Sequence, residues 1–315
     1  MAWNSYSGMA RKIIYLINPI SGTRGKLSLQ DLINRQTREK GIDFNIVPTN
    51  AEGDYSFLIP LIEQEQVTDI VVCGGDGTVN AVAAALMGKE VRIGIIPMGS
   101  GNGLAFAAGI PKSPSKALDL IFAGKSSRID GFTINGRFSC MLCGIGFDAR
   151  VAHAFAQQKT RGLGTYIKVA LIHFFSSRPY SFRIGVNGQS FPVEAFFISI
   201  ANSNQFGNQV TIAPMASLQD GLLDIVIAKK TGKFNLVLSL IRQVRGGNPV
   251  QTIPGGQEGK KILYFQTQAL TIINDQDAPL HIDGDPAPTS KEFTIRIIPK
   301  AFRLIQVTSH QSGID

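Results

Sequence analysis

A short apolar run meets a glycine-rich loop in residues 70–80, and this junction restricts the possible folds more than any other part of the sequence. It reads Ile-Val-Val-Cys-Gly-Gly-Asp-Gly-Thr-Val-Asn. An apolar run that stops at glycines is typical of a buried strand followed by a tight turn. The alanine-rich run Val79–Met87, closed by Gly88, predicts a helix directly after the loop. We therefore expect a strand, a glycine loop and a helix in succession, as in parallel α/β sheets.

The first third of the chain repeats this alternation of strand-like and helix-like segments. Such an alternation predicts a parallel sheet covered by helices, and so an α/β fold class for this part. Strands are expected at Lys12–Asn18, Asp43–Pro48, Asp69–Cys73 and Val91–Pro97, and helices up to about Lys40, over Ser56–Gln64 and over Leu104–Ala108.

From about Asp130 the pattern changes to strands separated by turns. Asn135-Gly136 and Asn187-Gly188 each stand between two strand-like runs, and Asn-Gly at such a place is a strong signal for a tight hairpin. This part is expected to be mainly antiparallel β, and 315 residues suit two domains of roughly 150 residues each. Helices are expected at Ala149–Gln158, Thr165–Ser176 and Lys233–Val244, and strands at Phe196–Ala201, Leu222–Ala228, Ile262–Thr267, Ala269–Ile273, Leu280–Ile282, Phe293–Ile298 and Arg303–Val307.

The composition favours anionic partners and a reducing compartment. The net charge is +8, but Lys and Arg form no block, so nucleic acid is not an expected partner. Charged residues make up 17%, which fits either extra apolar surface or a well-filled core. Cys73, Cys140 and Cys143 are too few for a disulfide framework, so we expect them in the core of a cytoplasmic protein. No apolar run approaches the ~20 residues of a membrane-spanning helix, so any membrane contact is expected to be peripheral.

Three loops at the ends of predicted parallel strands suggest a phosphate site. Glycines let backbone N–H groups approach phosphate oxygens, and a following helix adds partial positive charge at its N-terminus. Asp76 suits such a loop if Mg²⁺ accompanies the phosphates or if a hydroxyl group must be oriented; a tight turn with Asp76 as helix N-cap is the alternative. Met98–Gly103 and Asn18–Gly22 end the neighbouring strands, so all three loops are expected at one edge of the sheet. The Gly-x-x-x-x-Gly-Lys-Ser/Thr signature of P-loop enzymes is absent from the sequence.

These loops carry the motifs of a known family. Asn18-Pro-x-Ser-Gly22, Gly74-Gly-Asp-Gly-Thr78 with Asn80, and Pro97-x-Gly-Ser-Gly-Asn102 occur in order, followed by Asp220-Gly-Leu-Leu-Asp224 and Ile282-Asp-Gly-Asp285. The chain thereby resembles the diacylglycerol kinase catalytic-domain superfamily, which includes bacterial soluble lipid kinases, sphingosine kinases and ceramide kinases. The resemblance implies a Rossmann-like nucleotide-binding domain of the NAD-kinase/phosphofructokinase type over residues 1–130, completed by 302–315, and a β-sandwich lipid-acceptor domain over 131–301.

The resemblance also implies a reaction. ATP, with Mg²⁺, would donate a phosphate to a lipid hydroxyl in the cleft between the domains, and diacylglycerol is the expected acceptor. Asp285 would orient or deprotonate that hydroxyl and Asp283 would hold Mg²⁺ together with Asp76, although Asp-Gly-Asp alone is typical of an ordinary turn. The implied nucleotide contacts are Asn18, Ser21, Gly22, Thr49 (from a Thr-x-x-x-Gly-Asp motif), Gly74, Gly75, Asp76, Gly77, Thr78, Asn80, Gly99, Ser100, Gly101 and Asn102.

Further residues are implied near the lipid and at a structural metal. Asp148 and Asp130 stand where the family places polar residues near the cleft or the head group. Arg161 is a candidate to clamp a phosphate or contact anionic lipid, with solvated surface as its alternative, as helix capping is for Asp148. The resemblance suggests that Asp220 binds a structural metal with the backbone carbonyls of Ser217 and Leu222; a turn is the alternative.

Two departures from the family pattern keep other functions open. Ser100-Gly101-Asn102-Gly103 is closer to sphingosine and ceramide kinases than to the bacterial members, so a sphingoid base or ceramide is the alternative acceptor. Asp285 stands where the family has a glutamate, which is one methylene longer. An NAD kinase-like enzyme with a soluble acceptor and a catalytically silent nucleotide- or lipid-binding regulator are further alternatives, and retention of the three aspartates speaks against the regulator. A homodimer is compatible with the sequence.

Overall fold

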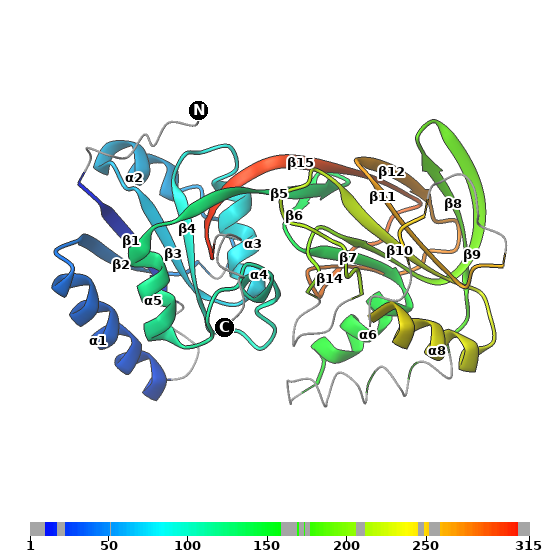
Figure 1. Ribbon diagram of the computed structural model, residues 1–315, viewed down its shortest axis with the longest axis horizontal. Helices are drawn as coiled ribbons and strands as arrows, with labels where there is room; N and C mark the ends of the chain where they lie inside the picture. Colours follow the sequence, from blue (N-terminus) through cyan, green and yellow to red (C-terminus); the bar gives the residue numbers. More distant parts are fainter. Residues whose placement is uncertain are drawn as a thin grey trace. The chain divides into compact units, whose positions relative to one another are not determined.

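The structure, a computed structural model (Figure 1), describes residues 10–17, 23–50, 52–158, 177–205, 212–244, 249–251 and 259–307, together with Val169 and His173. The chain divides into two compact units. Unit 1 consists of Met1–Gly99, Ala108–Arg128 and Phe302–Asp315, and unit 2 of Ser100–Ala107 and Ile129–Ala301. Two strands, Ser126–Ile134 (β5) and Glu292–Ile305 (β15), contribute residues to both units.

Unit 1 is built on a parallel sheet, which confirms the α/β fold class predicted from the alternating segments. Its strands are ordered β2-β1-β3-β4, and the end of β15 pairs in parallel with β4. The helix after the glycine loop begins at Asp76, earlier than the predicted Val79. The elements are β1 Lys12–Ile17, α1 Thr23–Glu39, β2 Asp43–Pro48, α2 Leu58–Glu65, β3 Asp69–Gly74, α3 Asp76–Ala85, β4 Arg92–Pro97 and α5 Pro114–Ala123.

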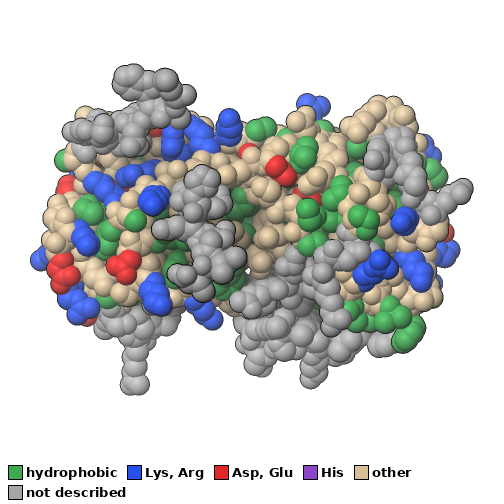
Figure 2. All heavy atoms as spheres, in the orientation of Figure 1, with side chains coloured by type: hydrophobic (Ala, Val, Ile, Leu, Met, Phe, Trp, Pro, Cys, Tyr) green, Lys and Arg blue, Asp and Glu red, His purple; other side chains and the backbone are tan. Residues whose placement is uncertain are grey.

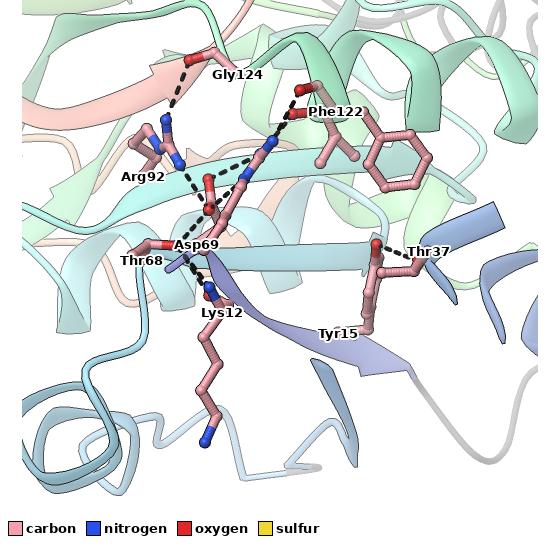
Figure 3. A network of polar contacts seen from close by, with 10 residues as sticks. Lys12, Tyr15, Thr37, Thr68, Asp69, Arg92, Phe122 and Gly124 are labelled. Atoms are coloured by element: carbon pink, nitrogen blue, oxygen red, sulfur yellow. Dashed lines mark hydrogen bonds and ion pairs between the residues drawn. The ribbon is translucent and has the colours of Figure 1, made fainter. Parts of the chain in front are cut away.

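Helix α5 is an addition to the predicted elements, and its ends explain why it forms. A proline stands in its first turn, and Gly124 ends it in the left-handed conformation at φ 67°. The helix packs closely on β4, because a Cβ at Gly94 would lie only 3.1 Å from the side chain of Ile121. On β1, the Tyr15 hydroxyl lies 2.9 Å from Oγ1 of Thr37 on α1 (Figure 3). Burial raises the pKa of Tyr15 to about 12.

A buried carboxylate joins the amino-terminal ends of three strands in unit 1 (Figure 3). Asp69, the first residue of β3, is fully buried and accepts from Arg11 at both oxygens, at 2.9 and 3.2 Å. Arg92, the first residue of β4, donates to the same carboxylate at 2.7 Å, and so does the hydroxyl of Thr68. Arg11 also donates to two carbonyl groups at the end of α5. A charge buried in this way is tolerated because each oxygen has charged and hydrogen-bonding partners.

Unit 2 is rich in antiparallel strands, as the sequence predicted. The strands follow the path β14-β13-β7-β9-β8-β12-β15, β10 pairs with β9 and β11, and β5 pairs with β6 and β15. Their apolar side chains form one buried cluster that includes Phe132, Phe182, Ile198, Phe265 and Phe293. The elements are α4 Gly103–Ala107, β6 Arg137–Ser139, β7 Leu142–Gly146, α6 Phe147–Ala156, β8 Tyr180–Val186, β9 Gln189–Ala201, β10 Leu223–Lys229, α8 Lys233–Val244, β11 Ile262–Thr267, β12 Ala269–Ile273, β13 Leu280–Ile282 and β14 Asp285–Ala287.

Both predicted Asn-Gly hairpins are present. Asn135 and Gly136 lie at φ 48° and 79°, and Asn187 and Gly188 at φ 51° and 75°, as a tight two-residue turn requires. The three cysteines are buried thiols that form no disulfide, which confirms their predicted place in the core. The helix expected at Thr165–Ser176 lies almost entirely outside the described residues. Within the described ranges, none of the helices combines the length and apolarity needed to span a bilayer.

Candidate functional site

Gly75 and Gly99, from the two glycine loops, meet at the carboxyl edge of the unit 1 sheet. Gly74 is paired with Pro97 at the ends of β3 and β4, and its carbonyl accepts from the backbone N–H of Met98 at 3.0 Å. A Cβ at Gly75 would lie 3.2 Å from Cα of Gly99, which is tighter than side chains normally allow. The loops therefore come this close because both positions are glycine.

The first turn of α3 offers backbone N–H groups at this edge. Gly75 is the N-cap residue and makes no side-chain capping bond, so the alternative of Asp76 as N-cap is wrong. Asp76 lies in the first turn instead, and the Asp76, Thr78 and Asn80 side chains are only partly buried, while Gly77 is exposed. A helix start carries partial positive charge and suits an anion such as phosphate.

The other expected nucleotide contacts are placed at several positions. Thr49 follows β2 and donates its N–H to the carbonyl of Ile17 at 3.1 Å, so it also lies at the carboxyl edge of the sheet. In unit 2, Ser100 is exposed and Gly101 is half-buried, whereas Asn102 is buried in the left-handed conformation at φ 54°. Three further predicted residues, Asn18, Ser21 and Gly22, lie outside the described part of the chain, as does the head-group candidate Arg161.

Asp283 and Gly284 form the turn of a hairpin between β13 and β14. Their φ angles are 52° and 87°, and Ile282 pairs with Asp285 across the turn. Oδ1 of Asp283 accepts from the Ser139 hydroxyl at 2.7 Å and from the backbone of Leu142 at 3.0 Å. The ordinary turn foreseen as the alternative is thus present, and it leaves Asp285 exposed at the start of β14.

A histidine holds this turn, a role that the sequence analysis did not predict. Nδ1 of His281 accepts from the N–H of Gly284 at 3.2 Å, and Nε2 lies 3.2 Å from Oδ2 of Asp148 in the first turn of α6. A Cβ at Gly144 would lie 2.3 Å from both of these side chains, so the pair occupies space that only glycine leaves open. Asp148 therefore faces His281, a partner that the sequence analysis did not suggest.

Asp130 has a structural position that differs from the expected head-group contact. Its side chain is buried, with 1% of the residue exposed. One oxygen accepts from the N–H of Lys300 at 2.7 Å and the other from the N–H of Gly221 at 2.8 Å. Both donors have left-handed backbone, at φ 55° and 71°, which turns their N–H groups toward the carboxylate. Asp130 therefore anchors β15 and the 218–221 turn, and its predicted contact with a lipid head group stays a prediction.

The expected structural-metal segment forms a turn. Oδ1 of Asp220 accepts from the N–H of Leu222 at 3.1 Å, and the Ser217 hydroxyl accepts from the N–H of Gln219 at 3.4 Å. Desolvation raises the pKa of Asp220, and the charge of Asp130 acts in the same direction. In the described part of the chain, no cluster of three or more His, Cys, Asp or Glu side chains could hold a metal ion. Binding through backbone carbonyls stays a prediction.

The second aspartate of that motif secures the segment to the sheet. Asp224 is fully buried on β10 and accepts from the Tyr264 hydroxyl at 2.6 Å and from Gln266 at 3.1 Å. The Tyr264 oxygen in turn accepts from the N–H of Met215 at 2.9 Å. Desolvation raises the pKa of Asp224. This role is one that the sequence motif alone does not reveal.

Two protein families match the chain in succession. The family described as "Diacylglycerol kinase catalytic domain" matches residues 12–134, and the one described as "YegS C-terminal NAD kinase beta sandwich-like domain" matches residues 142–306. A protein of Citrobacter koseri called "Probable lipid kinase YegS-like" is 30% identical over 276 residues, which cover 84% of this chain and 87% of the relative. A protein of the same name from Enterobacter sp. (strain 638) is 29% identical over 276 residues, with the same coverage.

Solved structures share the fold. A structure described as a diacylglycerol kinase from Bacillus anthracis str. Sterne has a TM-score of 0.73 at 21% identity, covering 94% of this chain and 97% of its own. A second solved chain from that organism has a TM-score of 0.76 at 21% identity, covering 94% and 96%. Because the identities are this low, these two structures support the fold alone.

Proposed function

The chain belongs to the YegS-like lipid kinase family, and we propose that it transfers the terminal phosphate of ATP to the free hydroxyl of diacylglycerol. The observation that carries the nucleotide half of this proposal is the close approach of the two glycine loops, with a Cβ at Gly75 limited to 3.2 Å from Gly99. The glycine backbone of these loops and the positive end of α3 together suit the phosphates of a nucleotide.

The carboxylate of Asp76 fits a metal-bound nucleotide. It lies in the first turn of α3, beside the N–H groups that would contact phosphate. Carboxylate and phosphate oxygens are the ligands that Mg²⁺ prefers, and bound Mg²⁺ would neutralise charge on the transferring phosphate. We therefore assign Asp76 to the metal and the surrounding glycine amides to the phosphate oxygens. Asp283 is a candidate second ligand for the metal, although its Oδ1 already accepts from Ser139 and Leu142.

Asp285 is the group that we assign to the acceptor hydroxyl. Asp285 is exposed on a short hairpin, which supports this role. Hydrogen bonds to Ser139, Leu142 and His281 hold the neighbouring turn in place. The acceptor oxygen forms a bond to the γ-phosphorus while the bond from that phosphorus to the bridging oxygen breaks, and ADP leaves with the electron pair. The hydroxyl proton passes to the Asp285 carboxylate. The lipid substrate implies that the enzyme works at a membrane surface.

The test is label transfer from radioactive ATP by the purified full chain. The acceptor panel contains diacylglycerol, monoacylglycerol, a sphingoid base, ceramide and NAD. We expect label in diacylglycerol; label in the sphingoid base or ceramide would favour the acceptor suggested by Ser100–Asn102, and label only in NAD would refute a lipid kinase. Asp285→Asn should lower kcat by at least about a hundredfold. Asp275→Asn, at another exposed aspartate of unit 2, is the matched control and should keep wild-type activity.

A further inference from the structure

Helix α8 has apolar side chains on two opposite faces. Leu236 faces inward and is fully buried, as is Gln243, which donates to the carbonyl of Ile212 at 3.0 Å. Phe234, Leu238 and Ile241, at the spacing of one helix stripe, face outward with 77%, 51% and 45% of each residue exposed. A surface helix normally keeps its outer face polar, so this outer stripe requires a separate explanation.

The stripe is a concentration of apolar surface. Nine large hydrophobic side chains are exposed in the described part of the chain, and four of them, including Val237, lie on α8. Figure 2 shows hydrophobic side chains gathered over this helix, with Lys and Arg side chains close by. Scattered exposed hydrophobics are normal in soluble proteins, whereas a contiguous group on one helix marks a surface that meets another apolar phase.

The segment of the sequence that carries the stripe is positively charged. From Ile225 to Gln257 the sequence contains five Lys and Arg residues and no Asp or Glu. Lys233 and Arg242 stand on α8 itself, and Lys230 precedes it and pairs with Glu194 at 3.0 Å. A partner that fits this surface therefore combines an apolar layer with negative charge. A bilayer with anionic head groups has both in the required order, because its acyl chains lie beneath the charged plane.

We propose that α8 docks the protein on an anionic phospholipid bilayer, with Phe234, Leu238 and Ile241 entering the head-group boundary and Lys233 and Arg242 contacting anionic head groups. This inference deepens the proposed function, on which it rests, because a kinase acting on a membrane lipid must reach that lipid from the aqueous side. Helices α6 and α8 lie on the same side of the unit 2 strands in Figure 1.

The experiment is co-sedimentation of the full chain with vesicles of phosphatidylcholine alone or mixed with phosphatidylglycerol. The wild type should partition onto the anionic vesicles. The double variant Phe234→Gln with Leu238→Gln should bind at least about tenfold more weakly, because two side chains lose their apolar contact with lipid. Lys233→Gln with Arg242→Gln should weaken binding to anionic vesicles by about fivefold per charge removed. Two controls in unit 1 should bind vesicles like the wild type. The apolar control is Met87→Gln, and the charge control is Lys112→Gln with Lys116→Gln.

Two companion measurements separate the possible results. Light scattering gives the oligomeric state. If the wild type forms an assembly that Phe234→Gln with Leu238→Gln disperses, and the vesicle binding of this variant is unchanged, α8 is an interface between copies. That result would overturn the proposal. The proposal would also be overturned if this double variant and the wild type bound vesicles equally, or if the wild type did not bind. Transfer of phosphate to a short-chain diacylglycerol in detergent should be equal in wild type and the α8 variants. Absence of that transfer would refute diacylglycerol as the acceptor while leaving the vesicle result intact.

Discussion

Replacing Asp69 by asparagine tests whether the buried network at the start of β3 holds unit 1 together. The substitution keeps the shape of the side chain and removes its charge. Arg11 and Arg92 would then face a neutral amide. Only 19% and 13% of their side chains are exposed to solvent, so water cannot replace the lost anion. Each guanidinium would lose the anion that compensates for its burial.

The expected loss in free energy of unfolding is about 3–5 kcal/mol, the cost of removing one partner from a buried ion pair. The upper part of this range is expected, since one carboxylate serves two cations and the Thr68 hydroxyl as well. A loss of this size is a large fraction of the stability of an ordinary domain. The pair between Lys12 and Glu65 has the same 2.7 Å separation as Arg92 and Asp69, but lies at the surface. Glu65→Gln should therefore leave stability nearly unchanged.

The assay is urea unfolding of the wild type and the two variants, followed by circular dichroism. Asp69→Asn should lower the urea midpoint of the first unfolding transition, and Glu65→Gln should not. The reasoning would be refuted if the free energy of unfolding of Asp69→Asn lay within about 1 kcal/mol of the wild-type value. That difference is roughly a fivefold change in the equilibrium constant. It would also be refuted if both variants lost equal stability, since burial would then not distinguish the two ion pairs.

Three further changes test the sites. Gly75→Ala should raise KM for ATP by about tenfold, because the added Cβ would lie 3.2 Å from Gly99 and force the phosphate loops apart; an unchanged KM would contradict this. Gly144→Ala should cost about 1–3 kcal/mol in urea unfolding and lower kcat, since its Cβ would lie 2.3 Å from two side chains, whereas Gly232→Ala meets nothing nearer than 3.7 Å and should be neutral. Asp224 has a pKa raised by desolvation, so its protonated form is favoured in the folded state: its contribution to stability is full below the unfolded pKa near 3.8 and is lost as pH rises through the folded pKa. Asp224→Asn should flatten the pH dependence of unfolding in that window, and an unaltered profile would rule this out.

Local patterns in the sequence predicted much of the fold. The strand, loop and helix at residues 70–80, the Asn-Gly hairpins and the bounds of α8 were all readable, because hydrophobic period and glycine conformation act over a few neighbouring residues. The meeting of the two glycine loops was readable as well, since carboxyl ends of adjacent parallel strands share one edge of a sheet. The family motifs further predicted that an α/β part precedes a β-rich part along the chain.

The tertiary structure decided the surroundings of the buried aspartates. Asp69 and Asp130 carry no local mark of their roles, since Arg11 and Lys300, which donate to them, lie 58 and 170 residues away in the sequence. Asp148 lies beside His281, which is 133 residues away in the sequence, so this contact has no local signal either. An aspartate has the same local preferences in a turn, a helix start, an ion pair or a ligand site, and only burial and long-range neighbours distinguish these. The same holds for α8: its sequence specifies a helix, but which apolar face packs inward and which stays exposed depends on strands that the helix meets only in the folded chain.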